Sequence, residues 1–133
     1  MTRRVTVLGS GVAGLSVAVE LARQQCDLAV VDPRGEPGPH GCSWWAGGML
    51  APDCEGETAE PAVVRLGREA AGWWAAAGAT VTRAGTLVVA AGRDTGELDR
   101  FARRTGGHRT LDRDGLAALE PTIASRFSRA LYF

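Results

Sequence analysis

Three glycines in one short turn form the clearest chemical pattern in this chain. Gly9, Gly11 and Gly14 follow the pattern G-x-G-x-x-G in the segment GSGVAG, and an acidic residue, Asp32, lies 18 positions after Gly14. Where such a turn opens a helix, its free backbone N–H groups and partial positive charge can bind a diphosphate. A carboxylate about 20 residues farther on can accept hydrogen bonds from ribose hydroxyls. Residue types and spacing together predict a dinucleotide site.

Each glycine has its own expected task in such a turn. Gly9 permits the sharp change of direction, Gly11 has no Cβ that would block a diphosphate, and Gly14 lets the helix approach the strand. An ordinary strand–helix–strand unit with a tight turn and no ligand is the alternative interpretation. The position of Asp32 favours the nucleotide site.

The elements around the turn are those that a nucleotide site requires. Residues 4–8 (RVTVL) are rich in β-branched side chains and predict a buried strand, and residues 12–25 predict a helix with an apolar side. Residues 28–31 (LAVV) predict a second buried strand, which ends at Asp32. We therefore expect an α/β fold that begins with a Rossmann-like βαβ unit.

After Asp32 the sequence continues as a long loop, rich in glycine and proline, that leads into SWWAGGML. A nicotinamide-binding unit would usually continue with another helix and strand. The Ser43 hydroxyl can donate a hydrogen bond to a phosphate, and Gly47 and Gly48 let the backbone come close to a flat ring system. These features favour FAD as the cofactor. His40 and Cys42 have no second cluster that would complete a four-ligand site, so we expect no metal.

Length and composition limit what the chain can be. Its 133 residues suffice for one modest domain, whereas a complete two-domain flavoenzyme needs more than about twice as many, so we expect an amino-terminal fragment. Fifteen arginines, with no lysine, balance fifteen acidic residues, which favours neither nucleic acid nor an anionic membrane as a partner. No stretch is long and apolar enough to span a bilayer. Three irregularly spaced cysteines favour the cytoplasm.

The arginine pair before the first strand offers an alternative location. Arg3 and Arg4 precede a largely apolar run, as in a twin-arginine export signal. Glycines interrupt that run, and a second strand follows it where a cleavage site would be expected. The pattern therefore favours the βαβ unit over an export signal.

The remainder of the chain alternates predicted helices and strands. Helices are expected at residues 62–77, 95–104 and 112–119, and strands at 80–83, 86–90, 108–111 and 130–133. We expect residues 1–80 to be the first segment of an FAD-binding domain. Residues 81–133 would begin a mixed α+β substrate domain and leave it truncated.

The sequence resembles the FAD-dependent D-amino-acid oxidase superfamily, and within it the glycine oxidases of thiamine biosynthesis. The resemblance is close over about the first sixty residues and extends to element order beyond them. The stretch AGGMLAP at this distance from the glycine turn is its most specific part. The segments that carry the resemblance are residues 7–14, residues 31–32, residues 43–52 (SWWAGGMLAP) and the acidic Glu55 and Glu57.

The resemblance implies oxidative deamination of glycine or another small amine. The substrate would pass a hydride to FAD, dioxygen would reoxidise the flavin, and the imine would enter thiazole synthesis or be hydrolysed. The resemblance also implies which residues contact the cofactor. The backbone of Val12 and Ala13 would contact the diphosphate, and Cys42 and Ser43 would lie along the phosphates. Asp32 would contact the ribose, with Pro33 beside it, and Gly47, Gly48 and Met49 would lie against the isoalloxazine.

Two departures from the family pattern affect the substrate pocket. Trp44 and Trp45 stand where many relatives carry small residues, so the shape of the pocket is left open. The arginine and tyrosine that hold the substrate carboxylate lie much later in such proteins, so no catalytic residue is assigned here.

Several functions remain open at this point. A D-amino-acid dehydrogenase or sarcosine oxidase would share the glycine turn, and a NAD(P)-binding dehydrogenase or a non-enzymatic nucleotide-binding module would share less of the pattern. We expect the 133-residue chain alone to bind FAD weakly and to be inactive. A homo-oligomer of the full-length protein is left open.

Overall fold

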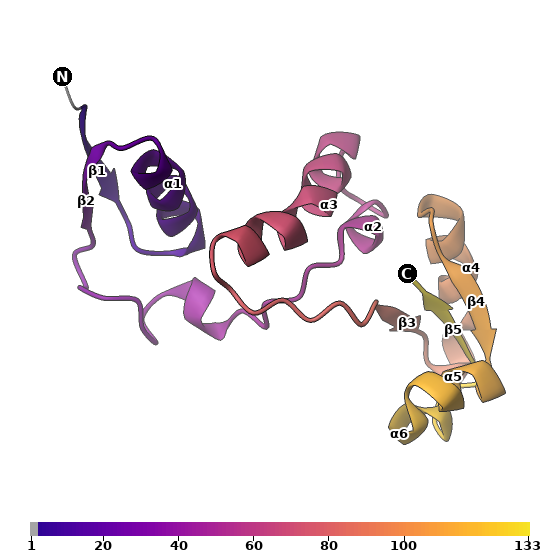
Figure 1. Ribbon diagram of the computed structural model, residues 1–133. Helices are drawn as coiled ribbons and strands as arrows, with labels where there is room; N and C mark the ends of the chain where they lie inside the picture. Colours follow the sequence, from indigo (N-terminus) through magenta and orange to yellow (C-terminus); the bar gives the residue numbers. More distant parts are fainter. Residues whose placement is uncertain (1–2) are drawn as a thin grey trace. The chain divides into compact units, whose positions relative to one another are not determined.

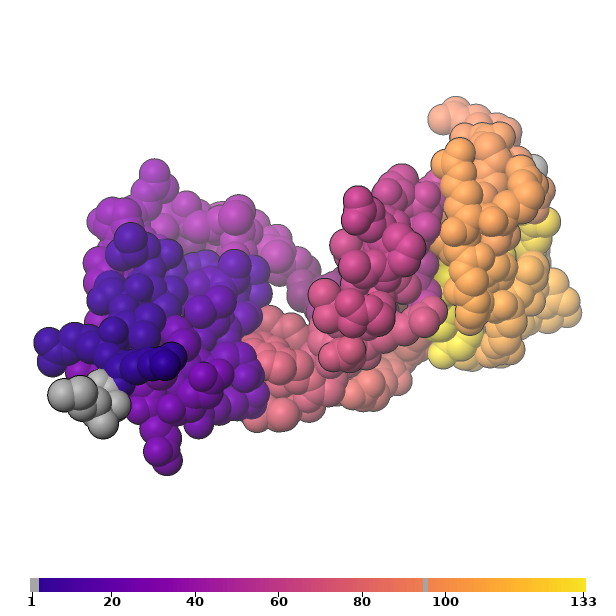
Figure 2. Space-filling view, turned by 90° about the horizontal axis from the view of Figure 1, so that it is seen from above, coloured from indigo at the N-terminus to yellow at the C-terminus, as the bar shows by residue number. Residues whose placement is uncertain are grey.

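The computed structural model describes residues 3–133, apart from the side chain of Thr95 (Figure 1). The chain divides into two compact units, Met1–Met49 and Leu50–Phe133. The residues of the first unit, indigo to purple, gather into one body in Figure 2. Helices and strands occur in both units, which confirms the predicted mixed α/β class. Every helix among the described residues is too short or too polar to traverse a lipid bilayer.

The first unit is built around one strand–helix–strand segment. Strand β1 (Arg4–Leu8) leads into helix α1 (Val12–Arg23), and the chain returns as strand β2 (Asp27–Val31). The two strands pair in parallel with Arg4 opposite Asp27. Helix α1 packs on both strands, and a 3-10 turn, η1 (Cys42–Trp45), follows the loop after β2. The three predicted elements of this unit are therefore present. Their predicted burial is wrong for both strands, because every residue of β1 and β2 is exposed or half-buried.

Helix α1 ends two residues before the predicted end at Gln25. Gln25 adopts a left-handed backbone conformation with φ of 59°, and its N–H donates to the Ala22 carbonyl over 2.9 Å. A residue in this conformation ends a helix because it turns the chain away from the helix axis. The turn delivers the chain to β2 within a few residues.

The second unit contains a three-stranded antiparallel sheet in the order β3 (Leu87–Val89), β5 (Arg129–Tyr132), β4 (Arg109–Asp112). Its core includes Leu116, which is fully buried, together with Leu111, Ala124 and Ala130. In chain order its elements are α2 (Pro52–Glu55), α3 (Pro61–Ala76), β3 (Leu87–Val89), the 3-10 turn η2 (Gly92–Asp94), α4 (Thr95–Arg104), β4 (Arg109–Asp112), α5 (Arg113–Leu119), α6 (Pro121–Ala124) and β5 (Arg129–Tyr132).

One predicted strand of the second unit is wrong. Within the described part of the chain, residues 80–83 form neither strand nor helix, and β3 occupies only the centre of the predicted segment 86–90. The partner of β3 is β5, and none of the strand pairings among the described residues includes residues 80–83. The Tyr132 hydroxyl donates to the Ala84 carbonyl over 3.1 Å, so β5 also fixes the chain just before β3.

The other helices and strands predicted beyond residue 80 are confirmed to within one or two residues. The acidic cap expected for α5 is Asp112, whose carboxylate accepts a hydrogen bond from the Gly115 N–H over 2.9 Å. The division into an FAD-binding segment and a substrate domain near residue 80 stays a prediction.

Candidate nucleotide-binding site

The glycine turn joins β1 to α1 in a form that excludes larger residues at two positions. Gly9 has φ of +101°, a conformation that glycine adopts without strain, and its N–H donates to the Val31 carbonyl over 2.8 Å. A Cβ at Gly14 would overlap the carbonyl oxygen of Gly9. The helix can therefore start this close to the strand only because residue 14 has no side chain.

The first N–H of helix α1 meets a side chain from a distant part of the chain. The Ser43 hydroxyl oxygen accepts a hydrogen bond from the Val12 N–H over 3.0 Å. The same oxygen lies 3.3 Å from the position that a Cβ would take at Gly11. The structure thus brings together two predicted phosphate contacts, and the Ser43 proton remains available to donate to an anion.

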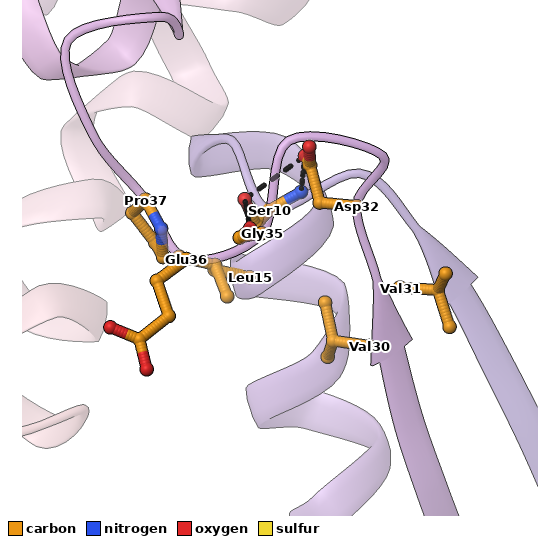
Figure 3. Close-up of a pocket in the computed structure, with 8 residues that line it drawn as sticks. All are labelled: Ser10, Leu15, Val30, Val31, Asp32, Gly35, Glu36 and Pro37. Atoms are coloured by element: carbon orange, nitrogen blue, oxygen red, sulfur yellow. Dashed lines mark hydrogen bonds between the residues drawn. The ribbon is translucent and has the colours of Figure 1, made fainter.

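Asp32 points toward the glycine turn, as a ribose-binding carboxylate should. Its Oδ2 accepts hydrogen bonds from the Ser10 N–H over 2.8 Å and from the Ser10 hydroxyl over 3.0 Å (Figure 3). Its Oδ1 accepts one from the Arg34 N–H over 2.9 Å. The Ser10 N–H contributes most to lowering the pKa of Asp32, followed by the Arg34 N–H, the Ser10 hydroxyl and the charge of His40. The carboxylate is therefore held ionised at neutral pH.

A pocket of about 450 Å³ opens beside this carboxylate. Its size lies in the range of small-molecule sites in proteins. Figure 3 shows Ser10 and Asp32 facing each other at one end, while the Glu36 carboxylate is turned away from them. Most of the lining side chains are apolar, which suits the flat ring of a nucleotide base. The lining residues are Ser10, Leu15, Val30, Val31, Asp32, Gly35, Glu36 and Pro37.

The other residues of the first unit that were predicted to contact the diphosphate or the ribose are Ala13, Pro33 and Cys42. Ala13 lies in the first turn of α1, and Pro33 directly follows Asp32. Cys42 begins η1 and is exposed.

The segment predicted to lie against the flavin is open in this structure. A Cβ at Gly47 or Gly48 would meet no atom within 4 Å, and the Met49 side chain is 77% exposed. No described contact joins these three residues to the glycine turn. Their role against the flavin stays a prediction.

Sequence reasoning missed Ser10 and the loop side of the pocket. Ser10 occupies a variable position of the glycine pattern, which names only its neighbours. The available signal was the place of Ser10 and Asp32 in the sequence. Each follows one of two strands predicted to be parallel neighbours, which would bring the hydroxyl close to the carboxylate. The lining by Gly35, Glu36 and Pro37 depends on the path of an irregular loop, which has no periodicity to reveal it.

A family model of FAD-dependent oxidoreductases matches residues 4–133. The chain belongs to this FAD-dependent oxidoreductase family. The predicted superfamily and its cofactor, FAD, are thereby confirmed. A protein of Rhizobium etli that carries the provisional name thiamine biosynthesis oxidoreductase ThiO is 56% identical over 131 residues, which are 98% of this chain and 40% of that protein. The chain therefore spans less than half the length of this relative.

The cysteines give a first experimental check on the placement of Ser43. Cys42 is exposed beside Ser43, whereas partial burial, with Asp53 and Glu55 nearby, raises the pKa of the Cys54 thiol. We expect iodoacetamide at pH 8 to modify Cys42 several times faster than Cys54, as measured by mass spectrometry of peptides. Excess FAD should slow the modification of Cys42 and leave Cys54 unchanged. Equal protection of both thiols would count against a phosphate site at Ser43.

Proposed function

We propose that this chain is the Rossmann-like amino-terminal segment of a cytoplasmic enzyme that oxidises the C–N bond of glycine or a similar small amine. Dioxygen would be the electron acceptor, and the imine product would supply the thiazole of thiamine or be hydrolysed. The name of the Rhizobium etli relative supports the link to thiamine. The observation that carries the nucleotide part is the orientation of Asp32, whose carboxylate accepts hydrogen bonds from the glycine turn.

The geometry of the first unit fits the adenosine diphosphate half of FAD. The diphosphate would lie over Gly11, against the N–H groups of Val12 and Ala13, with the Ser43 hydroxyl donating to it. Among the described residues, the Ser43 oxygen is the atom found within 4 Å of the position that a Cβ would take at Gly11, and a change of the Ser43 χ1 rotamer would move it aside for a phosphate. Asp32 would accept hydrogen bonds from the ribose hydroxyls.

The residues of this chain would bind and orient the cofactor, and FAD when bound would supply the capacity to accept a hydride. The pocket beside Asp32 would hold the adenine among apolar side chains. The backbone at Gly47 and Gly48 would lie against the flavin ring, where N–H groups stabilise negative charge. We assign no catalytic residue within the chain.

The proposed reaction is tested on the full-length protein that contains this sequence. We expect it to copurify with FAD and to release hydrogen peroxide in the presence of glycine and dioxygen. Reduction of an artificial dye without peroxide would identify a dehydrogenase, and a preference for sarcosine over glycine would identify a different amine oxidase. Binding of NADH in place of FAD would contradict the proposal, and so would bound FAD that no amine reduces.

The 133-residue chain alone gives a second test. We expect it to bind FAD weakly and to produce no peroxide from glycine, because the described residues include no group that we can assign to the substrate carboxylate. Absorbance after gel filtration measures the bound flavin. A stoichiometric yellow cofactor together with oxidase activity would contradict this expectation.

A further inference from the structure

Ser10 lies where three segments of the first unit meet. Its side chain follows β1, faces Asp32 at the end of β2 and approaches the loop at Gly35 (Figure 3). The residue is 8% exposed, which is low for a hydroxyl-bearing side chain. Its hydroxyl oxygen lies 3.0 Å from Asp32 Oδ2 and 3.4 Å from the Gly35 carbonyl oxygen. The single hydroxyl proton is best donated to the carboxylate, because that contact is the shorter one and has a charged acceptor.

The contacts of Ser10 fix both the position and the rotation of the Asp32 carboxylate. The Ser10 N–H and hydroxyl approach the same oxygen, Oδ2, while the Arg34 N–H binds Oδ1. Two donors on one oxygen and one on the other leave a single rotation of the carboxylate that satisfies all three. One lone-pair site, on Oδ1, then remains, and it is presented in a fixed direction.

We propose that the Ser10 hydroxyl is a positioning group that orients Asp32 toward the ribose hydroxyls and so sets the preference of this site for ribonucleotides over their 2′-deoxy analogues. The inference rests on the proposed nucleotide function. Ser10 itself contacts no reacting atom, because its proton is already committed to Asp32. Removing the hydroxyl would leave the two backbone donors in place and give the carboxylate more rotational freedom.

The experiment compares ADP and 2′-deoxy-ADP as ligands of the 133-residue chain, with dissociation constants from NMR titration. We expect the unaltered chain to bind ADP about 10-fold more tightly than 2′-deoxy-ADP, because the loss of one hydrogen bond to a charged group weakens binding by about that factor. Ser10→Ala should weaken ADP binding about 5- to 10-fold and leave 2′-deoxy-ADP nearly unchanged, so that the preference is lost. Ser10→Thr, which keeps a hydroxyl, should retain part of the preference for ADP.

A matched control removes a different hydroxyl from the same unit. Ser16 donates to the Val12 carbonyl within α1 over 2.7 Å, so Ser16→Ala should leave the nucleotide preference unchanged. A general loss of structure in Ser10→Ala would weaken both ligands equally, and that result would overturn the positioning role. An undiminished preference in Ser10→Ala would overturn it as well. If the chain binds too weakly to measure, the same comparison is made on the full-length protein that contains it. Absence of binding of either nucleotide there would show that the proposed nucleotide function is itself wrong, and the role of Ser10 would fall with it.

Discussion

Replacing Gly14 by alanine should abolish nucleotide binding and unfold the first unit. The added Cβ would overlap the carbonyl oxygen of Gly9, and this is backbone that cannot move without opening the turn. Overpacking of a side chain against other side chains costs roughly 1–3 kcal/mol, and a clash with backbone should exceed that range. We expect Gly14→Ala to show no measurable ADP binding in an NMR titration and to lose the dispersed amide signals of residues 4–31.

The control for this variant adds the same methyl group where there is room for it. Gly72 lies in α3, is exposed, and a Cβ there would meet no atom within 4 Å. Gly72→Ala should stabilise the helix by roughly 0.5–1 kcal/mol, because glycine loses more backbone entropy on folding than alanine does. Thermal unfolding followed by circular dichroism measures both variants. Retention of ADP binding in Gly14→Ala would show that the turn is not packed as described.

The unit most affected by Gly14 is also the one that the sequence predicts best. Strands β1 and β2 and helix α1 follow from local patterns, namely runs of β-branched residues and an apolar face at helical spacing. The bounds of both strands were predicted to within one residue. The helix end was less predictable, because nothing in the pattern shows that Gln25 adopts a left-handed conformation.

Contacts across long loops were only partly predictable. A phosphate role for Ser43 follows from its residue type and from the family resemblance, but its hydrogen bond to the Val12 N–H depends on the path of the loop between them. The short helices α2 and α6, each of four residues, span barely one helical turn and so show no repeating apolar pattern. Residues 80–83 have strand-like composition but no partner strand, and composition cannot show which segments will pair.

For Asp32, the residue type, the distance from the glycine turn and the observed orientation all favour a contact with the ribose. Replacing Asp32 is therefore a strong test of the nucleotide site. Asp32→Asn keeps the shape of the side chain but replaces one acceptor oxygen by an NH₂ group. Both carboxylate oxygens accept N–H groups, from Ser10 and from Arg34, so either orientation of the amide places donor against donor. The variant also loses the charge that strengthens these bonds and any bond to ribose. We expect ADP affinity to fall roughly 10- to 100-fold in calorimetry.

The control is the aspartate at the opposite end of the same strand. Asp27 begins β2 and forms an exposed ion pair with Arg4 over 2.9 Å, a type of contact that contributes little to stability. Asp27→Asn should therefore bind ADP as the unaltered chain does. Equal losses in the two variants would indicate a general effect of charge and would contradict a ribose contact at Asp32.

The dependence of binding on pH gives the same assignment a second, independent readout. The three N–H and O–H donors lower the pKa of Asp32 below its ordinary value of 3.8, so its charge persists to a more acidic pH than in the unfolded chain. A lowered pKa stabilises the folded state above that ordinary value, and the stabilisation is lost as the pH falls through the lowered pKa. ADP has proton-binding groups of its own, with a phosphate pKa of about 6, so the informative quantity is the ratio of the ADP affinities of the unaltered chain and Asp32→Asn, in which the titration of ADP cancels. This ratio should stay constant from neutral pH down to about pH 5 and decline only below the ordinary pKa of Asp32. Asp32→Asn should show only the acid dependence that ADP contributes, because it carries no proton-binding group at this position. A decline of equal size in both proteins would assign the acid dependence to another residue and remove Asp32 from the site.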